Sequence, residues 1–424
     1  MAKVVIAAVG SRGDTAPLIA IGTRLQQAGH EVTMSAQSIF EDLVTSCGLR
    51  FRPHDLSLPG LDTAAPGMVA PGVPEMSDIE NPAKAVMRFM SPKGMQATGE
   101  GLLRTLRDEP ADILLLSPFA ELAGHPLAEA RGVPSIGIRL QAMSTTADFP
   151  PSILGGWSAG PMLNRAAGRF GAGWVERYCA KPIAALRSQL GLPKVSARAL
   201  RRRRTEAEWP ILHGFSSTVV PRPRDWRRGL EVVGYWWPPR PLGWEPPADV
   251  VRFLESGQPP VYIGFGSLPM PKAKAAQVSD LIGQALRKAG VRGIVQSGWA
   301  QLAVSSDDVL TVGEIPHDWL FDRVAAVAHA CGAGTTGAGL RAGVPAVALP
   351  NAGDQSFWAR RLDKLGVSAG TVPLKKLTAD SLAGAITTAV TDPDLRANAK
   401  AVAAHLATED GPAAVLQTVE RLTT

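Results

Sequence analysis

Residues 325–355 constrain the fold more than any other stretch of the chain. An apolar run ends at His329, the small-residue turn Gly332-Ala333-Gly334-Thr335-Thr336-Gly337 follows, and a helical pattern and a second apolar run then lead to Asp354-Gln355. This order predicts a buried strand that turns directly into a helix, where free N–H groups and the helix dipole favour a bound anion. The stretch therefore predicts a phosphate site at the end of a strand.

Short apolar runs alternate with helical patterns on both sides of a proline-rich segment. Such runs lie at 4–9, 30–34, 113–116 and 135–140 in the first half. In the second half they lie at 260–267, which ends in a small-residue turn, and at 293–296 and 309–312. Alternation at this spacing predicts parallel, doubly wound sheets, and 424 residues suit two domains. We therefore expect an α/β fold of two Rossmann-like domains facing a cleft.

The proline-rich segment predicts the domain boundary. Residues 221–247 contain seven prolines and four tryptophans, a composition that breaks helices and central strands. We expect a first domain over 1–220, a linker over 221–247, a second domain over 248–405, and a C-terminal helix over 406–424 that packs back on the first domain.

Composition limits the classes of partner and compartment. The chain has 44 Lys and Arg against 38 Asp and Glu, and the resulting net charge of +6 is modest for a protein of 424 residues. We therefore expect no nucleic-acid partner and only a weak peripheral contact with anionic membranes. Cys47, Cys179 and Cys331 form no C-x-x-C pair, which argues against disulfides and structural zinc. No signal-peptide pattern or long apolar run is present, so the sequence predicts a cytoplasmic monomer or dimer without a membrane-spanning helix.

Asp14 follows the first predicted strand, at the edge where open α/β sheets bind their ligands. It either acts on a ligand there or caps the helix that begins near Pro17. Ser267 takes the matching place in the second domain, and Trp299 either stacks on a flat base or fills a core. The apolar segments 55–76 and 145–157 predict walls for a hydrophobic ligand.

The glycine spacing also permits a different enzyme class. Gly332-x-Gly334-x-x-Gly337, with Asp354 about twenty residues on, satisfies the dinucleotide fingerprint of NAD enzymes, in which the acid binds a ribose hydroxyl. An NAD-dependent oxidoreductase is therefore a second hypothesis. Asp392-x-Asp394 precedes a helix, so we expect capping there and no metal site.

Seven segments recur in the order known from one family. They are Gly10-Ser11-Arg12-Gly13-Asp14-Thr15-x-Pro17, Val261 to Ser267, Ser297-Gly298-Trp299, Gly313-Glu314-Ile315-Pro316-His317, His329-x-x-Gly332-Ala333-Gly334-Thr335-Thr336, Arg341 to Pro345, and Asp354-Gln355-x-Phe357-Trp358. Over essentially the whole chain, the sequence resembles GT-B glycosyltransferases of the glycopeptide-antibiotic, macrolide and sterol glucosyltransferase type.

This resemblance implies inverting, metal-independent transfer of a sugar from a UDP- or TDP-sugar to a hydroxyl group of a hydrophobic natural-product or lipid acceptor. It implies no tightly bound cofactor, with the acceptor in the first domain and the donor in the second. The roles carried over are Asp14 as general base; His329, Ser267, Gly332, Gly334, Thr335 and Thr336 at the diphosphate; Trp299, Ile315 and Pro316 at the base; Asp354 and Gln355 at the donor sugar; and Ser11, Arg12, Met143 and Phe149 at the acceptor.

Cys331 departs from the family pattern. Many relatives read His-His-Gly-Gly-Ala-Gly-Thr where this chain has His329-Ala330-Cys331-Gly332-Ala333-Gly334-Thr335. His329 keeps the position that contacts the donor phosphate in the family. Cys331 adds a side chain where backbone usually approaches the donor, which leaves a non-catalytic nucleotide-sugar-binding homologue as a third hypothesis.

Overall fold

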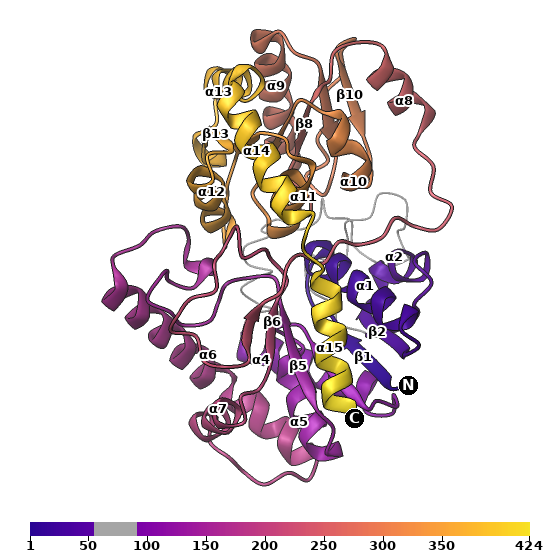
Figure 1. Ribbon diagram of the computed structural model, residues 1–424, viewed down its shortest axis with the longest axis vertical. Helices are drawn as coiled ribbons and strands as arrows, with labels where there is room; N and C mark the ends of the chain where they lie inside the picture. The colour runs from indigo at the N-terminus through magenta and orange to yellow at the C-terminus, as the bar shows by residue number, and fades with distance from the viewer. Residues whose placement is uncertain (55–90) are drawn as a thin grey trace.

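The computed structural model describes residues 1–54 and 91–424, so the predicted ligand wall over 55–76 lies outside the described residues. Two α/β domains, each built on one sheet, lie one above the other (Figure 1). Every pair of neighbouring strands in both sheets is parallel. The prediction of two Rossmann-like domains is confirmed.

The first sheet has the strand order β3-β2-β1-β4-β5-β6-β7. Its strands are β1 (Lys3–Ala7), β2 (Glu31–Gln37), β3 (Arg50–His54), β4 (Ile113–Leu116), β5 (Ser135–Arg139), β6 (Ile211–His213) and β7 (Leu230–Val232). The central strands are apolar throughout because helices cover both faces of a parallel sheet. The chain builds outward from β1 to β3 and then returns to place β4 on the other side of β1. The carboxyl ends of β1 and β4 therefore flank a topological switch point.

The second sheet repeats this design with the order β10-β9-β8-β11-β12-β13. Its strands are β8 (Val261–Gly264), β9 (Gly293–Gln296), β10 (Val309–Val312), β11 (Ala326–His329), β12 (Ala346–Ala348) and β13 (Ser368–Thr371). Here the switch point lies between β8 and β11, which pair with His329 opposite Gly264. Open α/β sheets bind ligands at such points.

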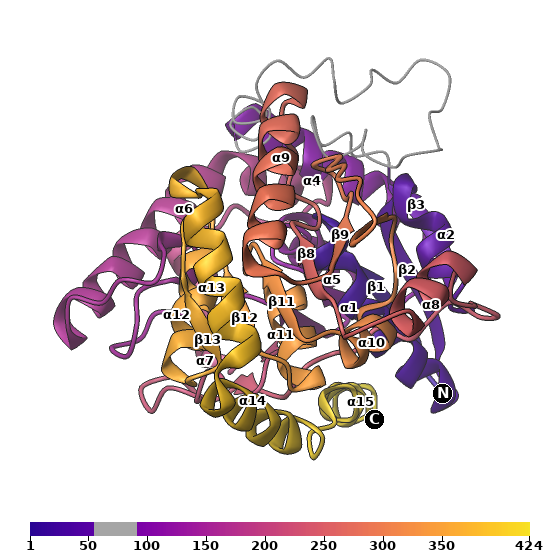
Figure 2. The same cartoon turned by 90° about the horizontal axis from the view of Figure 1, so that it is seen from above.

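Helices cover the two sheets and connect the domains (Figure 2). In the first domain they are α1 (Arg12–Gln27), α2 (Glu41–Thr45), α4 (Pro92–Leu106), α5 (Glu121–Arg131), α6 (Pro161–Gln189) and α7 (Ala197–Glu206), with the short η1 (Ser38–Phe40) and η3 (Ser152–Leu154). The second half contains α8 (Ala248–Glu255), α9 (Lys272–Ala289), α10 (His317–Leu320), η4 (Phe321–Arg323), α11 (Ala333–Ala342), α12 (Gln355–Lys364), η5 (Leu374–Lys376), α13 (Ala379–Thr391), α14 (Pro393–Leu406) and α15 (Gly411–Thr423). No helix within residues 1–54 and 91–424 is long and apolar enough to span a bilayer.

The C-terminal helix α15 lies beside α1 of the first domain (Figure 1). Val415 and Val419 are fully buried in the same core cluster as Ile19 and Val4. Arg24 of α1 also pairs with Asp410, at 3.6 Å, just before α15 begins. The preceding helix α14 stays with the second domain, where it packs against α11.

The segment expected to be a linker is partly a strand. Leu230–Val232 forms β7 and pairs with β6 at the edge of the first sheet, and the prolines lie outside those three residues. An edge strand needs hydrogen bonds on one side only, so a proline-rich neighbourhood does not prevent it. The chain leaves the first sheet after β7, where Trp236 packs at 2% exposure against the backbone of Gly214.

Candidate active site

The predicted site residues follow the carboxyl ends of strands around the two switch points. In the first domain the turn after β1 carries Ser11 and Asp14. In the second, the segments after β8, β9, β10, β11 and β12 carry the predicted donor-binding residues. These two edges face each other, because Arg12 forms an ion pair with Glu314, at 3.1 Å between Nε and Oε1, across the domain boundary.

Asp14 lies in the first turn of α1 and is held by three donors. Its Oδ2 accepts the Ser11 backbone N–H at 2.8 Å and the Ser11 hydroxyl at 2.9 Å, and its Oδ1 accepts the Gln141 side-chain amide at 3.2 Å. The capping role left open by the sequence is therefore present, and the carboxylate is still half-exposed at the sheet edge. Sequence reasoning missed Gln141. Only its position, two residues after β5, could have indicated from the sequence that Gln141 lies near Asp14.

Gly10 makes room for this carboxylate. Its φ is +150°, and a Cβ at this position would lie 2.5 Å from Asp14 Oδ2. Gly10→Ala is therefore expected to displace the carboxylate and to lower the transfer rate by about 10–100-fold, since small misplacements of reacting groups are costly. The measurement is kcat/KM for sugar transfer.

Gly13→Ala is the matched control for that variant. Gly13 lies in the same turn, but the nearest atom to its added Cβ is Ser11 Oγ at 3.5 Å, an ordinary contact. It should keep nearly full activity. Equal activity in Gly10→Ala and Gly13→Ala would show that the position of Asp14 does not limit the reaction.

His329 ends β11 and is 1% exposed. Its Nδ1 accepts the backbone N–H of Cys331 at 3.1 Å, so Nδ1 carries no proton. Burial lowers the pKa of His329 to about 4, which keeps the imidazole neutral near pH 7 and places its one proton on Nε2. His329 is therefore a neutral hydrogen-bond donor at the switch point.

The first turn of α11 lies next to His329 and leaves backbone donors free. The N–H groups of Ala333, Gly334 and Thr335 have no partner inside the helix. No atom lies within 4 Å of where a Cβ would stand on Gly332 or Gly334, so both backbones face open space. This geometry suits an anion at the helix N-terminus.

Thr336 lies one residue further into α11. Its backbone N–H donates to the Gly332 carbonyl at 2.9 Å, and its hydroxyl is buried without a hydrogen-bond partner among the described residues. Of these two groups, only the hydroxyl is free to serve the predicted role of Thr336 at the diphosphate. Ser267, after β8, is half-buried beside the same edge.

Cys331 adopts a left-handed backbone conformation. Its φ is +60°, in the left-handed region that favours glycine. The thiol is fully buried in a core cluster with Leu340 and Ala348, and Sγ lies 3.5 Å from the His329 carbonyl. The side chain therefore points into the domain and leaves the edge that faces the first domain clear.

The predicted base-binding residues lie at neighbouring strand ends. Trp299 is 8% exposed, and its backbone N–H donates to the Gly266 carbonyl at 3.1 Å, which joins the segments after β9 and β8. Ile315 is buried in a cluster with Trp319, and Pro316 precedes α10. Most of the Trp299 ring thus fills the core, and only a small part reaches the surface.

Asp354 and Gln355 begin α12 at the end of β12. Asp354 accepts the Trp358 indole N–H at 2.8 Å. Burial raises the pKa of Asp354 above its usual range, and the negative charge of Asp14 adds to this increase. Gln355 Oε1 accepts the N–H groups of Asn351 and Ala352, at 2.7 and 3.1 Å, which leaves its NH₂ group free to donate. The charge of Asp14 thus reaches Asp354 across the domain boundary.

The predicted acceptor residues have different surroundings. Ser11 binds Asp14, and Arg12 pairs with Glu314 of the other domain. Met143 is half-buried beyond β5. Phe149 is 5% exposed and packs edge-on against Phe357 with ring centroids 5.4 Å apart, so it contributes to the packing between the domains.

His317 is a further residue that sequence reasoning named only as part of a motif. Burial, with a smaller contribution from the charge of Arg12, lowers the pKa of His317 to about 3. Its ring stacks on Phe321 with centroids 4.4 Å apart. A second neutral imidazole therefore lies near His329 and the domain boundary.

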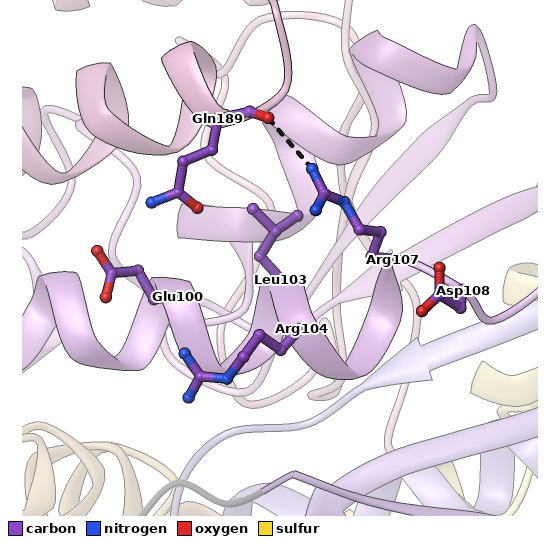
Figure 3. Close-up of a pocket in the computed structure, with 6 residues that line it drawn as sticks. All are labelled: Glu100, Leu103, Arg104, Arg107, Asp108 and Gln189. Atoms are coloured by element: carbon purple, nitrogen blue, oxygen red, sulfur yellow. Dashed lines mark hydrogen bonds between the residues drawn. The ribbon is translucent and has the colours of Figure 1, made fainter.

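Two other features lie away from these residues. A cavity of about 410 Å³ beside α4 is lined by charges of both signs, and Arg107 there donates to the Gln189 carbonyl at 3.1 Å (Figure 3).

Asp392 accepts the N–H groups of Asp394 and Leu395, so the predicted capping is confirmed. Among the described residues, no group of three or more His, Cys, Asp or Glu is arranged to hold a metal ion.

Two family models match the chain. The glycosyltransferase family 28 N-terminal domain matches residues 4–97, and the C-terminal domain of erythromycin biosynthesis protein CIII-like proteins matches residues 294–422. Among solved structures, the kitacinnamycin glycotransferase has a TM-score of 0.71 at 17% identity and covers 100% of this chain and 99% of its own. The glycosyltransferase VinC, solved with DTDP, has a TM-score of 0.65 at 15% identity and covers 99% of each chain. These structures share the fold.

Relatives at higher identity cover nearly the whole chain. Sterol 3-beta-glucosyltransferase UGT80B1 of Arabidopsis thaliana is 31% identical over 99% of this chain and 68% of its own length. O-mycaminosyltylonolide 6-deoxyallosyltransferase of Streptomyces fradiae is 31% identical over 96% of this chain and 94% of its own. The chain spans 64% of sterol 3-beta-glucosyltransferase UGT80A2 of Arabidopsis thaliana, at 30% identity. With this identity and fold, the chain belongs to the GT-B glycosyltransferase family that includes the sterol 3-beta-glucosyltransferases and the macrolide glycosyltransferases.

Proposed function

We propose that this chain is an inverting glycosyltransferase that moves a sugar from a UDP- or TDP-sugar to a hydroxyl group of a hydrophobic natural-product or lipid acceptor. The observation that carries the proposal is the juxtaposition of the two switch points. Asp14 follows β1 beside Arg12, which pairs with Glu314 of the second domain, and His329 ends a strand at that second-domain edge. A donor sugar bound between the two edges would have the base on one side and the leaving-group site on the other.

The reaction needs one proton acceptor and one group to stabilise the leaving charge. The acceptor oxygen attacks the anomeric carbon, its proton passes to Asp14, and the bond from that carbon to the diphosphate oxygen breaks. In-line displacement inverts the configuration. Among the described residues, Asp14 Oδ1 has a single donor, Gln141, whereas Oδ2 has two. Because a carboxylate oxygen offers two lone pairs, Oδ1 is the better-placed proton acceptor.

The leaving diphosphate would be held by neutral donors. His329 supplies Nε2–H, and the first turn of α11 supplies backbone N–H groups and the positive end of its dipole. These groups provide the stabilisation that a metal ion gives in other transferases. Asp354 and the free NH₂ of Gln355 would bind hydroxyl groups of the sugar.

The names of the relatives support the substrate classes. The printed names include sterol glucosyltransferases and an O-mycaminosyltylonolide deoxyallosyltransferase, and structures of similar fold were solved with thymidine diphosphate and DTDP. The matched relatives are transferases, which weighs against the NAD-dependent oxidoreductase.

Ligand-dependent unfolding and product analysis test the proposal. UDP or TDP should raise the unfolding midpoint, and NAD should not. At a nucleotide concentration of 100 times Kd, the free energy of unfolding should increase by about 2.7 kcal/mol. UDP- and TDP-hexoses are then incubated with sterols, macrolide aglycones and phenols. Mass spectrometry detects the glycoside, and NMR of the anomeric proton reports inversion. Stabilisation by NAD alone would favour the oxidoreductase, and nucleotide binding without transfer or donor hydrolysis would favour the non-catalytic homologue.

A further inference from the structure

Exposed apolar side chains concentrate on one part of the first domain. Across residues 1–54 and 91–424, ten large hydrophobic side chains are exposed, and eight of them lie between Ile153 and Val175. They are Ile153, Leu154, Trp157, Met162, Leu163, Phe170, Trp174 and Val175. Scattered exposed apolar residues are normal, but a contiguous group marks an interaction surface.

The helix α6 arranges part of this group as a stripe. Leu163, Phe170 and Trp174 follow one another at spacings of seven and four residues, so they share one face of the helix. They are 56%, 77% and 51% exposed. The opposite face is buried through Asn164 and Gly168. The N-terminal part of α6 projects from the body of the domain in both views (Figures 1 and 2).

Positive charge accompanies the stripe. Between residues 153 and 181 the chain has Arg165, Arg169, Arg177 and Lys181 against Glu176 alone, four cations minus one anion, or a net +3. Arg165 pairs with Asp225, and Glu176 pairs with Arg201. Within the described part of the chain, Arg169, Arg177 and Lys181 form no ion pair and are exposed. The cations beside the stripe are therefore available to an anionic partner.

We propose that residues 153–181 form a docking surface for an anionic lipid bilayer. Phe170, Trp174 and Met162 enter the interface between headgroups and acyl chains, and Arg169 and Arg177 contact anionic headgroups. Aromatic and long apolar side chains beside cations are the composition of helices that lie on membranes. The stack of Trp174 on Tyr178, with centroids 4.8 Å apart, orders that side chain before it inserts.

A second copy of the chain fits this surface less well. Two copies related by a twofold axis would bring the same net +3 segments together, and like charges across an interface are unfavourable. An anionic bilayer complements both the stripe and the charge. The proposal does not depend on the reaction that the domain boundary supports.

Vesicle sedimentation with the full chain tests whether residues 153–181 dock on an anionic bilayer. Wild-type protein should bind phosphatidylcholine vesicles that contain phosphatidylglycerol, and should bind pure phosphatidylcholine more weakly. Phe170→Ser with Trp174→Ser should lower the partition coefficient by at least about tenfold. Arg169→Gln and Arg177→Gln should each lower it by about fivefold and reduce its salt dependence. Leu242→Ser, at a residue 78% exposed outside the group, should change nothing.

Unfolding midpoints and light scattering accompany these measurements. A double variant that melts like wild type but no longer binds supports the proposal. Equal vesicle binding by wild type and the double variant would overturn it, as would a wild type that binds neither vesicle. A wild-type dimer that the double variant converts to monomer would instead assign the surface to self-association.

Discussion

Asp14→Asn is expected to lower the rate of sugar transfer by about 10²–10⁴-fold, the usual contribution of a positioned general base. The amide keeps the size of the carboxylate and can still cap α1, so the fold should survive. It cannot take the acceptor proton at Oδ1, the oxygen to which Gln141 donates. The loss should appear in kcat, because the proton moves only as the reaction proceeds. Steady-state kinetics with a saturating donor measures it.

Asp42→Asn is the control for charge removal. Asp42 lies exposed at the start of α2 in the same domain, and its variant should transfer sugar at the wild-type rate. UDP or TDP should stabilise Asp14→Asn as much as wild type, because the proposed diphosphate site lies on the other domain. Undiminished transfer by Asp14→Asn would show that another group takes the proton.

The sequence predicted the elements of the site better than their contacts. Buried parallel strands need continuous apolar runs, so the strands ending near Asp14 and His329 could be located from residues alone. Their assembly at two switch points depends on strand order, which local patterns do not encode. The hydrogen bond from Gln141 to Asp14 joins residues 127 positions apart, and no single-sequence pattern predicts such a pair.

Burial bears on two of the predicted site residues. Thr336 was assigned to the diphosphate by its place in a motif, and its hydroxyl is buried without a hydrogen-bond partner among the described residues. Phe149 was assigned to an acceptor wall by its apolar loop, yet the loop meets α12 and the ring is covered by Phe357. An apolar side chain is expected to be buried, but the sequence does not show whether a ligand or another domain covers it.

Cys331 has a side chain at a position whose backbone conformation favours glycine. A left-handed conformation costs a residue with a side chain about 1–2 kcal/mol, and the structure keeps it at φ +60°. The buried thiol fills core volume, which offsets part of that cost. The N–H of this residue still reaches His329 Nδ1, so the tautomer that the donor site needs is preserved.

His329→Ala is expected to lower kcat/KM by about 10²–10³-fold, as removal of one preorganised donor to a developing oxyanion does. His329→Gln should retain more activity than His329→Ala or His329→Asn, because its amide NH₂ extends nearest to the place of Nε2–H. The effect should be larger on kcat than on donor affinity, since charge on the diphosphate grows toward the transition state. Steady-state kinetics of the three variants gives this ranking.

The protonation state of His329 provides an independent test. With its pKa lowered to about 4 by burial, against an ordinary value of about 6.5, the native state excludes a proton that the unfolded state binds. Stability is therefore lost as the pH falls from 6.5 toward 4, by about 1.4 kcal/mol per pH unit. His329→Gln removes this component, so urea unfolding at pH 7 and pH 5 should show a loss about 2 kcal/mol smaller than in wild type.

Donor binding distinguishes a neutral imidazole from a cation. A neutral donor at Nε2 predicts that His329 adds no pH dependence to the affinity for UDP or TDP between pH 6 and 8, because its charge does not change there. Isothermal titration of wild type and His329→Gln should give parallel pH profiles. If the affinity of wild type, but not of His329→Gln, increased as the pH falls through 7, His329 would bind the diphosphate as an imidazolium. In that case the bound diphosphate, and not burial alone, would determine the charge of His329.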